Sequence, residues 1–185
     1  IDASALDILV KYKEEFRKAF ATRNSLGLER VVLTPHVGEF KRLYRAFVGE
    51  DIGVDTPRKQ EIDDILSNDQ MESILNCIKR FVEIVGCTLV LKDFRTFACL
   101  SDGKIYSMLG ENSGLSKGGS GDVLAGLMAG MLAQPLSYDK AILVAVFCHT
   151  EAAKLLSLDR KYGKRYMLPN DIIEYLGFVY NRLGW

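Results

Sequence analysis

The sequence lacks the patterns of a metal-binding or disulfide-stabilised protein. Its four cysteines are Cys77, Cys87, Cys99 and Cys148. No two of them form a C-x-x-C pair, and the only histidines, His36 and His149, complete no zinc-ligand spacing with them. We therefore expect free thiols in a reducing compartment and no metal site built by protein side chains alone.

Long apolar runs and a net charge are absent as well. The longest uncharged run, Val123 to Tyr138, is shorter than the ~20 residues that a membrane span needs, and it contains Pro135. Lys and Arg total 24 and Asp and Glu total 24, so the formal net charge is +0, which argues against nucleic acid or an acidic membrane as a partner. No signal-peptide pattern opens the sequence. We expect a cytoplasmic protein, with organellar targeting left open.

What is present is the composition of a globular α/β domain. Hydrophobic residues make up 48% of the chain and charged residues 26%, which are values for a packed core rather than for disorder. We expect a single domain over residues 1–185. The sequence opens at Ile1-Asp2 without a methionine, and we interpret these residues as the tail of a strand whose preceding part is missing.

Apolar periodicity predicts helices that alternate with short strands. The predicted helices are Ala3–Phe20, Val37–Val48, Asp69–Val85, Val123–Leu132, Tyr138–Leu158 and Asp171–Leu183, the last of them capped by Asn170. The predicted strands are Val31–Leu33, Thr88–Leu91, Thr96–Leu100 and Lys104–Ser107. Ser101-Asp102-Gly103 joins the last two strands as a hairpin, so a mixed sheet covered by helices is expected.

The strongest chemical motif is Gly118-Gly119-Ser120-Gly121-Asp122, directly before a helix. Glycines let backbone N–H groups converge, and a helix N-terminus adds unpaired donors and a positive dipole, so the loop suits a phosphate. The charge of Asp122 would repel that phosphate, which favours another role: a base that takes a proton from a substrate hydroxyl. The alternative is an ordinary glycine-rich turn in which Asp122 caps the helix.

A second motif, Leu33 to Phe40, places a strand end, a proline turn and a helix start in succession. This order puts His36 and Glu39 at the carboxyl edge of the sheet, where open α/β sheets bind ligands. Alternatively, Thr34 caps the helix, Glu39 satisfies first-turn N–H groups and His36 is merely exposed. Lys92, which follows the strand Thr88–Leu91, can reach a nucleotide at the same edge or can be a surface lysine.

Four segments in this order resemble the ADP/ATP-dependent NAD(P)H-hydrate dehydratases, a branch of the ribokinase-like superfamily. They are Ile1–Leu6, similar to D-A-D-A-L, Thr34–Phe40, similar to T-P-H/N-x-x-E, Gly118–Gly126, similar to G-G-x-G-D-x-L-x-G, and Pro169–Ile173 in the closing helix. The resemblance implies a ribokinase-like three-layer αβα sandwich that is partial, because the N-terminal strands of the family are absent from this sequence.

The resemblance also implies an activity and the residues that carry it. Members use ATP or ADP, with Mg²⁺, to phosphorylate the ring hydroxyl of hydrated NAD(P)H, and the phosphate then leaves by elimination. Asp122 matches the aspartate that contacts the hydrate and acts as base. The rest of the implied substrate pocket is His36, Val37, Gly38, Glu39, Phe40, Lys41 and Arg42. The implied nucleotide site is Lys92, Asp93, Phe94, Arg95, Thr96, Asn112, Ser113, Gly114, Leu115, Ser116, Lys117, Gly118, Gly119, Ser120 and Gly121.

Three positions depart from the family pattern, and two other functions stay open. Asp93 stands where the family usually has glycine, Lys117 where a small residue is common, and Ser4 where D-A-D-A-L has its second aspartate. A ribokinase-like kinase of a thiazole or pyrimidine alcohol would share the G-x-G-D motif but release a stable phosphate ester. The third possibility is a non-catalytic fragment that binds nucleotide at most, and its support is the absence of the upstream strands from this sequence. Small molecules are the expected partners, and a homo-oligomer is left open.

Overall fold

The computed structural model describes residues 1–52, 68–93, 95–108, 115, 117–159 and 167–185. Its contacts divide the chain into two compact units. The first contains Ile1, residues 3–92 and residues 99–106, and the second contains Asp2, residues 93–98 and residues 107–185. The single domain expected over residues 1–185 stays a prediction.

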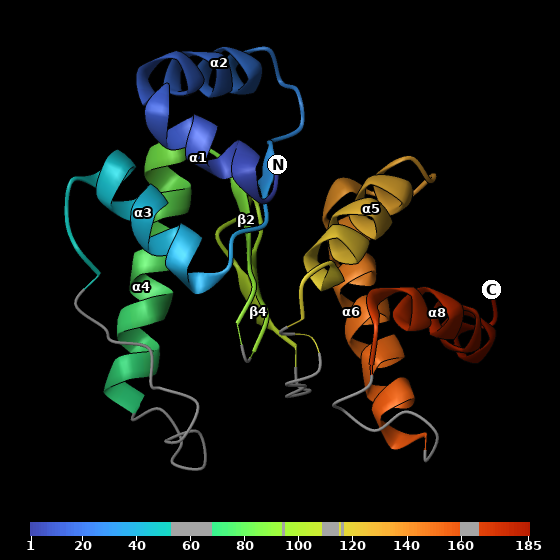
Figure 1. Ribbon diagram of the computed structural model, residues 1–185. Coiled ribbons are helices and arrows are strands. Elements are labelled where there is room, and N and C mark those ends of the chain that lie inside the picture. The colour runs from blue at the N-terminus through green and yellow to red at the C-terminus, as the bar shows by residue number, and fades with distance from the viewer. Residues whose placement is uncertain (53–67, 94, 109–114, 116, 160–166) are drawn as a thin grey trace. The chain divides into compact units, whose positions relative to one another are not determined.

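The described elements follow the alternating order that the sequence predicts (Figure 1). The helices are α1 (Ser4–Lys11), α2 (Lys13–Ser25), α3 (Val37–Val48), α4 (Asn68–Val85), α5 (Ser120–Leu132), α6 (Tyr138–Leu158) and α8 (Pro169–Leu183). The strands are β1 (Val32–Leu33), β2 (Thr88–Leu91), β3 (Phe97–Cys99) and β4 (Ile105–Ser107).

The strands form one mixed sheet in the order β1-β2-β3-β4. β1 and β2 are parallel, with Val32 opposite Thr88 and Leu33 opposite Leu89. All four residues of β2 are buried, as expected for a strand covered on both faces. The hairpin is antiparallel, because the N–H of Leu100 donates to the carbonyl of Lys104 at 3.0 Å. The predicted mixed sheet is therefore confirmed.

The first unit packs around an aromatic cluster between α3 and α4. Phe81 of α4 lies edge-on to Phe40 and to Phe47 of α3, with ring centroids 5.3 and 6.1 Å apart. Leu43 and Ile78 from the same two helices are fully buried beside them. Ile1 lies beside β1 without forming a strand: its amino group donates to the carbonyl of Val32 at 2.7 Å, and its carbonyl accepts from the N–H of Thr34 at 3.1 Å.

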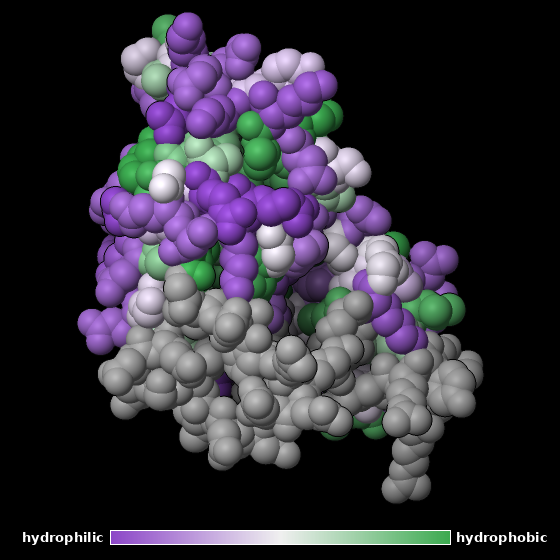
Figure 2. Space-filling model, turned by 60° about the vertical axis from the view of Figure 1, so that its left-hand side comes forward, coloured by the Kyte–Doolittle hydropathy of each residue, from purple (hydrophilic) through white to green (hydrophobic). Residues whose placement is uncertain are grey.

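The single helix predicted over Ala3–Phe20 is wrong. The chain leaves the helical conformation at Tyr12 (φ −116°, ψ 42°) and continues as the separate helix α2. The break lets α1 bury Leu6 and Leu9 while α2, which is polar over most of its surface, still buries Phe20. Hydrophilic side chains accordingly cover the upper part of the face in Figure 2, where α2 lies.

Truncation of Phe81 should destabilise the first unit strongly. Its ring is 0% exposed and contacts two other buried aromatic rings. We expect Phe81→Ala to lower the free energy of unfolding by about 3–5 kcal/mol, since it removes this contact area and leaves a cavity. Ile84→Ala on the exposed side of the same helix is the control and should change it by about 1 kcal/mol or less. Urea denaturation measures both, and equal effects would contradict the packing described.

Three of the described helices, α5, α6 and α8, lie in the second unit. α6 packs against both α5 and α8. Buried residues from α6, α8 and the segment before α8 form its core: Cys148, Ala152, Ala153, Leu156, Met167, Ile172, Leu176 and Val179. Among the described residues, α6 alone has the length and composition to cross a membrane, yet 56% of its most apolar window is buried inside the structure. A core helix passes the same test, so this is weak evidence for a membrane span.

Two helix starts in the second unit differ from the predictions. α5 begins at Ser120 rather than Val123, so the last two residues of the glycine-rich loop are helical. α8 begins at Pro169, because proline is pre-organised for the first helical position. Asn170 therefore lies inside the helix, and its predicted capping role is wrong. The carboxylate of Asp171 instead accepts from the N–H of Leu168 at 2.8 Å.

Candidate functional site

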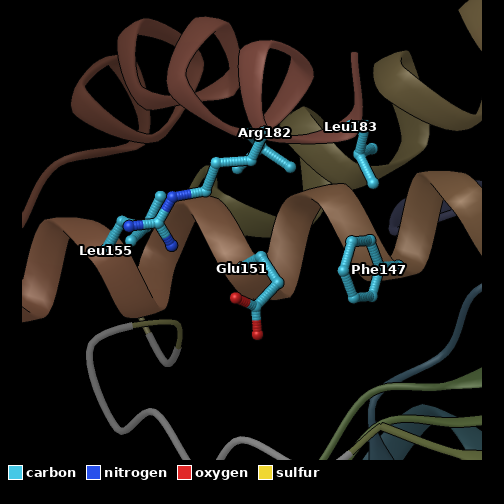
Figure 3. Close-up of a pocket in the computed structure, with 6 residues that line it drawn as sticks. Phe147, Glu151, Leu155, Arg182 and Leu183 are labelled. Atoms are coloured by element: carbon cyan, nitrogen blue, oxygen red, sulfur yellow. The ribbon is translucent and has the colours of Figure 1, made fainter. Parts of the chain in front are cut away.

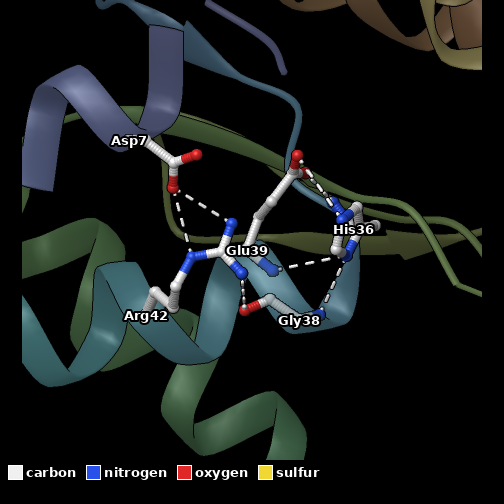
Figure 4. Close-up of polar contacts among 5 residues, drawn as sticks. All are labelled: Asp7, His36, Gly38, Glu39 and Arg42. Carbon is white, nitrogen blue, oxygen red and sulfur yellow. Dashed lines mark hydrogen bonds and ion pairs between the residues drawn. The ribbon is translucent and has the colours of Figure 1, made fainter. Parts of the chain in front are cut away.

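The first group of predicted site residues surrounds the N-terminus of α3 (Figure 4). His36 is the N-cap: its Nδ1 accepts hydrogen bonds from the N–H groups of Gly38 (3.0 Å) and Glu39 (3.3 Å). Glu39 returns the bond, its carboxylate accepting from the N–H of His36 at 2.8 Å. Because Nδ1 is an acceptor twice, it carries no proton, and the imidazole presents a single N–H at Nε2.

This capping pattern corrects one alternative considered for the sequence. Thr34 does not cap α3: it is buried, and its hydroxyl donates to the carbonyl of Ile1 at 3.2 Å. The glycine at position 38 is also explained, because a Cβ there would lie 2.9 Å from Cε1 of His36. Glu39 is expected to accept from N–H groups in the first turn of the helix. Its carboxylate does accept from a backbone N–H, but this is the N–H of the cap residue, His36.

Arg42 is oriented by a residue that sequence reasoning missed. The carboxylate of Asp7 in α1 accepts from Nη2 of Arg42 at 3.0 Å and from Nε at 3.2 Å. Nη1 donates to the carbonyl of Gly38 at 3.4 Å. Both partners are more than half exposed, so the pair adds little stability, but it fixes where the guanidinium points. Sequence spacing offers no signal for it, since the partners lie 35 residues apart.

The other predicted residues of this segment differ in how deeply their side chains are buried. Val37 and Lys41 are half-buried, whereas Phe40 is 1% exposed and belongs to the aromatic core. Lys92 lies beside the segment: it forms a parallel bridge with His36, and its N–H donates to the carbonyl of Pro35 at 2.8 Å. The predicted position of His36 and Glu39 at the carboxyl edge of the sheet is thus confirmed, and the structure adds that Lys92 lies beside them.

A cap substitution tests this geometry. We expect His36→Ala to lower the free energy of unfolding by about 1 kcal/mol, because two N–H groups of α3 lose their acceptor. His36→Asn keeps a side-chain acceptor at the cap and should retain most of that stability. Chemical denaturation of both variants measures the difference. Equal losses in the two would show that the imidazole does not act as the cap.

The second group belongs to the other unit and centres on the start of α5. Gly119 is the N-cap, in a left-handed conformation with φ +91°, and no side chain caps the helix. Its carbonyl accepts from Val123, and the carbonyl of Lys117 accepts from Ser120. No described residue accepts a hydrogen bond from the N–H of Gly121 or of Asp122. The helix therefore presents two open donors, as an anion site requires.

Asp122 lies in the first turn of α5 and is exposed. The alternative in which it caps the helix is wrong, because Gly119 holds the cap position. Among the residues that the structure describes, none forms a hydrogen bond or ion pair with its carboxylate. The side chain is consequently not committed to a structural role in the described part of the chain.

Two contacts from the neighbouring helices hold the start of α5. A Cβ added at Gly119 would lie 2.8 Å from Cγ of Pro169, so the first residue of α8 packs directly against the cap. Nε2 of His149, buried in α6, lies 3.0 Å from the carbonyl oxygen of Ser120. His149 is thus a buried histidine with a polar partner on another helix.

The remaining predicted nucleotide residues are only partly described. Lys117 and Leu115 are half-buried and Gly118 is exposed. Asp93, Arg95 and Thr96 lie between β2 and β3, and the carbonyl of Thr96 accepts from Met108 in the hairpin. The predicted residues outside the described part are Phe94, Asn112, Ser113, Gly114 and Ser116.

Two other features of the structure, the buried cysteines and a small groove beside α6, contain none of the predicted site residues. Burial raises the pKa of Cys87 to about 12 and the pKa values of Cys99 and Cys148 to about 11, so these thiols stay protonated and unreactive at neutral pH. A small groove between α6 and α8 is drawn in Figure 3. It is lined by Phe147, Glu151, Leu155, Val179, Arg182 and Leu183, none of which is a predicted site residue.

These features define a ribokinase-like α/β protein with an open helix N-terminus suited to phosphate. The chain matches a ribokinase-like superfamily protein of Enterococcus faecalis with a TM-score of 0.63 and 27% identity, over 98% of this chain and 51% of that one. The profile of the NAD(P)H-hydrate dehydratase family matches residues 1–177. The chain belongs to this family, and the resemblance drawn from its motifs is confirmed.

Named relatives point the same way. An ADP-dependent (S)-NAD(P)H-hydrate dehydratase of Neisseria meningitidis is 31% identical over 84% of this chain and 44% of its own length. The crystal structure of an ADP/ATP-dependent NAD(P)H-hydrate dehydratase from Bacillus subtilis, co-crystallised with ATP/Mg²⁺, matches with a TM-score of 0.65 and 26% identity. That match covers 84% of this chain and 50% of the relative. The chain thus spans half or less of the length of these two relatives.

Proposed function

We propose that the protein dehydrates hydrated NAD(P)H, with ATP or ADP as the phosphoryl donor. The observation that carries the proposal is the start of α5, where two open amide donors stand beside an exposed aspartate with no described partner. Amides and a carboxylate in one helical turn suit a phosphate and the hydroxyl that attacks it. The family match supports a dehydratase over a kinase of another alcohol.

The nucleotide phosphates are assigned to the amides of Gly121 and Asp122, and Gly118 adds no side chain beside them. The nucleotide's other contacts are proposed along Lys92–Thr96 and Asn112–Lys117. Among the described residues, no group of three His, Cys, Asp or Glu side chains could hold a metal ion. Mg²⁺ therefore fits as an ion carried by the phosphates, where it supplies charge neutralisation. The Bacillus subtilis relative was co-crystallised with ATP/Mg²⁺.

The hydrated nicotinamide is assigned to the start of α3. Nε2 of His36 lies 3.5 Å from Oε1 of Glu39, so these two side chains form one polar group there, and Arg42 carries a guanidinium held in place by Asp7. In the proposed reaction, the Asp122 carboxylate accepts the proton of the ring hydroxyl. The hydroxyl oxygen at the same time forms a bond to the terminal phosphorus of the donor nucleotide. The bond to the leaving nucleotide breaks. The phosphate then departs from the ring as the C–O bond cleaves, a proton is lost from the neighbouring ring carbon to solvent, and the C=C bond of NAD(P)H forms between these two carbons. The products are NAD(P)H, inorganic phosphate and the shortened nucleotide.

The distinguishing experiment supplies full-length protein with ATP, Mg²⁺ and chemically hydrated NADH. The dehydratase regenerates NADH, seen as recovery of its absorbance, and it does so only with the nucleotide present. A kinase of a thiazole or pyrimidine alcohol would leave the hydrate unchanged and accumulate a stable phosphate ester from those alcohols. A protein that binds ATP in calorimetry but turns over neither substrate would be the non-catalytic alternative. Four free thiols, three of them buried, agree with the proposed cytoplasmic location.

A further inference from the structure

His149 is a buried polar residue that the proposed reaction does not use. It lies on the apolar helix α6 and is 5% exposed, in a unit whose core is mainly apolar. A buried imidazole keeps its place only when its polar atoms are satisfied, since an unpaired one costs stability. Nε2 is satisfied across the helix interface: it lies 3.0 Å from the carbonyl oxygen of Ser120 and 3.5 Å from the hydroxyl of the same residue.

The partner of His149 determines what this contact does. A carbonyl oxygen only accepts, so Nε2 carries the proton and donates it to Ser120. The carbonyl of Ser120 and the N–H of Gly121 belong to one planar peptide group. The imidazole therefore holds the peptide plane whose opposite end is one of the two open donors at the start of α5. A bond to the carbonyl also polarises the peptide and strengthens its N–H as a donor.

We propose that His149 is a positioning residue that aims the N–H of Gly121 at the nucleotide phosphate. The inference rests on the proposed function, because it takes the phosphate site at the start of α5 as given. His149 touches neither substrate in this account: it acts through the Ser120–Gly121 peptide, from the side of α5 that faces α6. Its loss should therefore weaken nucleotide use while the hydrate site stays intact.

Two substitutions separate this role from simple packing. His149→Met keeps an unbranched apolar side chain of similar size but removes the donor, whereas His149→Gln can place an amide N–H near the position of Nε2. We expect His149→Met to raise the KM for ATP about tenfold, with the KM for hydrated NADH changed less than about twofold. His149→Gln should bring the KM for ATP back to within about threefold of wild type.

Thr150→Val is the matched control. Thr150 is the next residue on α6 and is also buried, but its hydroxyl donates to the carbonyl of Val146 within its own helix at 2.9 Å. Removing it deletes a buried hydrogen bond without touching α5, so the melting temperature should fall while the KM for ATP stays at the wild-type value. If His149→Met does not fold, His149→Asn replaces it, since that amide is one methylene too short to reach Ser120.

The outcomes distinguish this inference from the proposed function. If wild type regenerates NADH but His149→Met, or its Asn substitute, keeps a wild-type KM for ATP, the positioning role is wrong and the function stands. The same conclusion follows if Gln rescues nothing, or if Thr150→Val raises the KM for ATP equally. If wild type shows no nucleotide-dependent recovery of NADH, the proposed function has failed, and the inference fails with it.

Discussion

Replacing Asp122 with asparagine should lower turnover of hydrated NADH by about 10²–10⁴-fold, the range that a positioned general base contributes. Asparagine has the same size and leaves the open amides of α5 unchanged, but it cannot accept the hydroxyl proton. The affinity for ATP should be retained or rise, because a negative charge beside the phosphates is removed. Steady-state kinetics of NADH recovery give the first quantity, and calorimetric titration with ATP and Mg²⁺ gives the second.

Asp139→Asn is the matched control for this substitution. Asp139 occupies the first turn of α6, as Asp122 occupies the first turn of α5, so the same helix-dipole interaction is lost in both variants. We expect turnover in the control to stay within about twofold of wild type, because the residue belongs to neither group of site residues. Near-normal turnover in Asp122→Asn would show that Asp122 is not the general base.

Gly119→Ala should have a large effect on stability for a single added methyl group. The backbone there has φ +91°, which an L-residue adopts only with strain, and the new Cβ would lie 2.8 Å from the rigid ring of Pro169. We expect the free energy of unfolding to fall by about 2–4 kcal/mol from strain and overpacking together. Turnover should fall as well, because relief of the contact moves the cap of α5 away from Pro169.

Two further variants separate the contribution of backbone strain at Gly119 from that of the close contact with Pro169. Gly118→Ala adds the same methyl group one residue earlier, where no atom lies within 4 Å of the new Cβ and φ is not positive. Its free energy of unfolding should stay within about 1 kcal/mol of wild type. Pro169→Ala combined with Gly119→Ala removes the close contact but keeps the backbone strain, so it should recover part of the loss. A double variant that recovers nothing would show that the contact with Pro169 contributes nothing.

Local sequence signals predicted most elements, and tertiary contacts explain the misses. Val37–Val48, Thr88–Leu91 and Tyr138–Leu158 have the predicted bounds, because apolar periodicity and flanking residues agree there. The break at Tyr12 carries no comparable signal, since both segments on either side have helical spacing. It follows from the need to bury Leu6, Leu9 and Phe20 together.

The same division holds for the candidate site. The motif residues at the starts of α3 and α5 were predicted from the sequence, because strand ends and glycine-rich turns carry recognisable residue types. The residues that hold them in place were not: Asp7 reaches Arg42 across 35 residues, and His149 reaches Ser120 across 29. Such partners have no local spacing, so only the folded chain shows them.

The central claim is that the donor's phosphoryl group is transferred to the hydrated cofactor and then lost by elimination. The ratio of NADH formed to ATP converted to ADP, measured by chromatography on one sample of full-length protein during turnover, tests it most directly. The mechanism predicts one NADH for each ATP consumed, with an equal amount of phosphate released and no reaction when the nucleotide is omitted. NADH formed without ATP consumption, or ATP consumed while the hydrate remains, would contradict it.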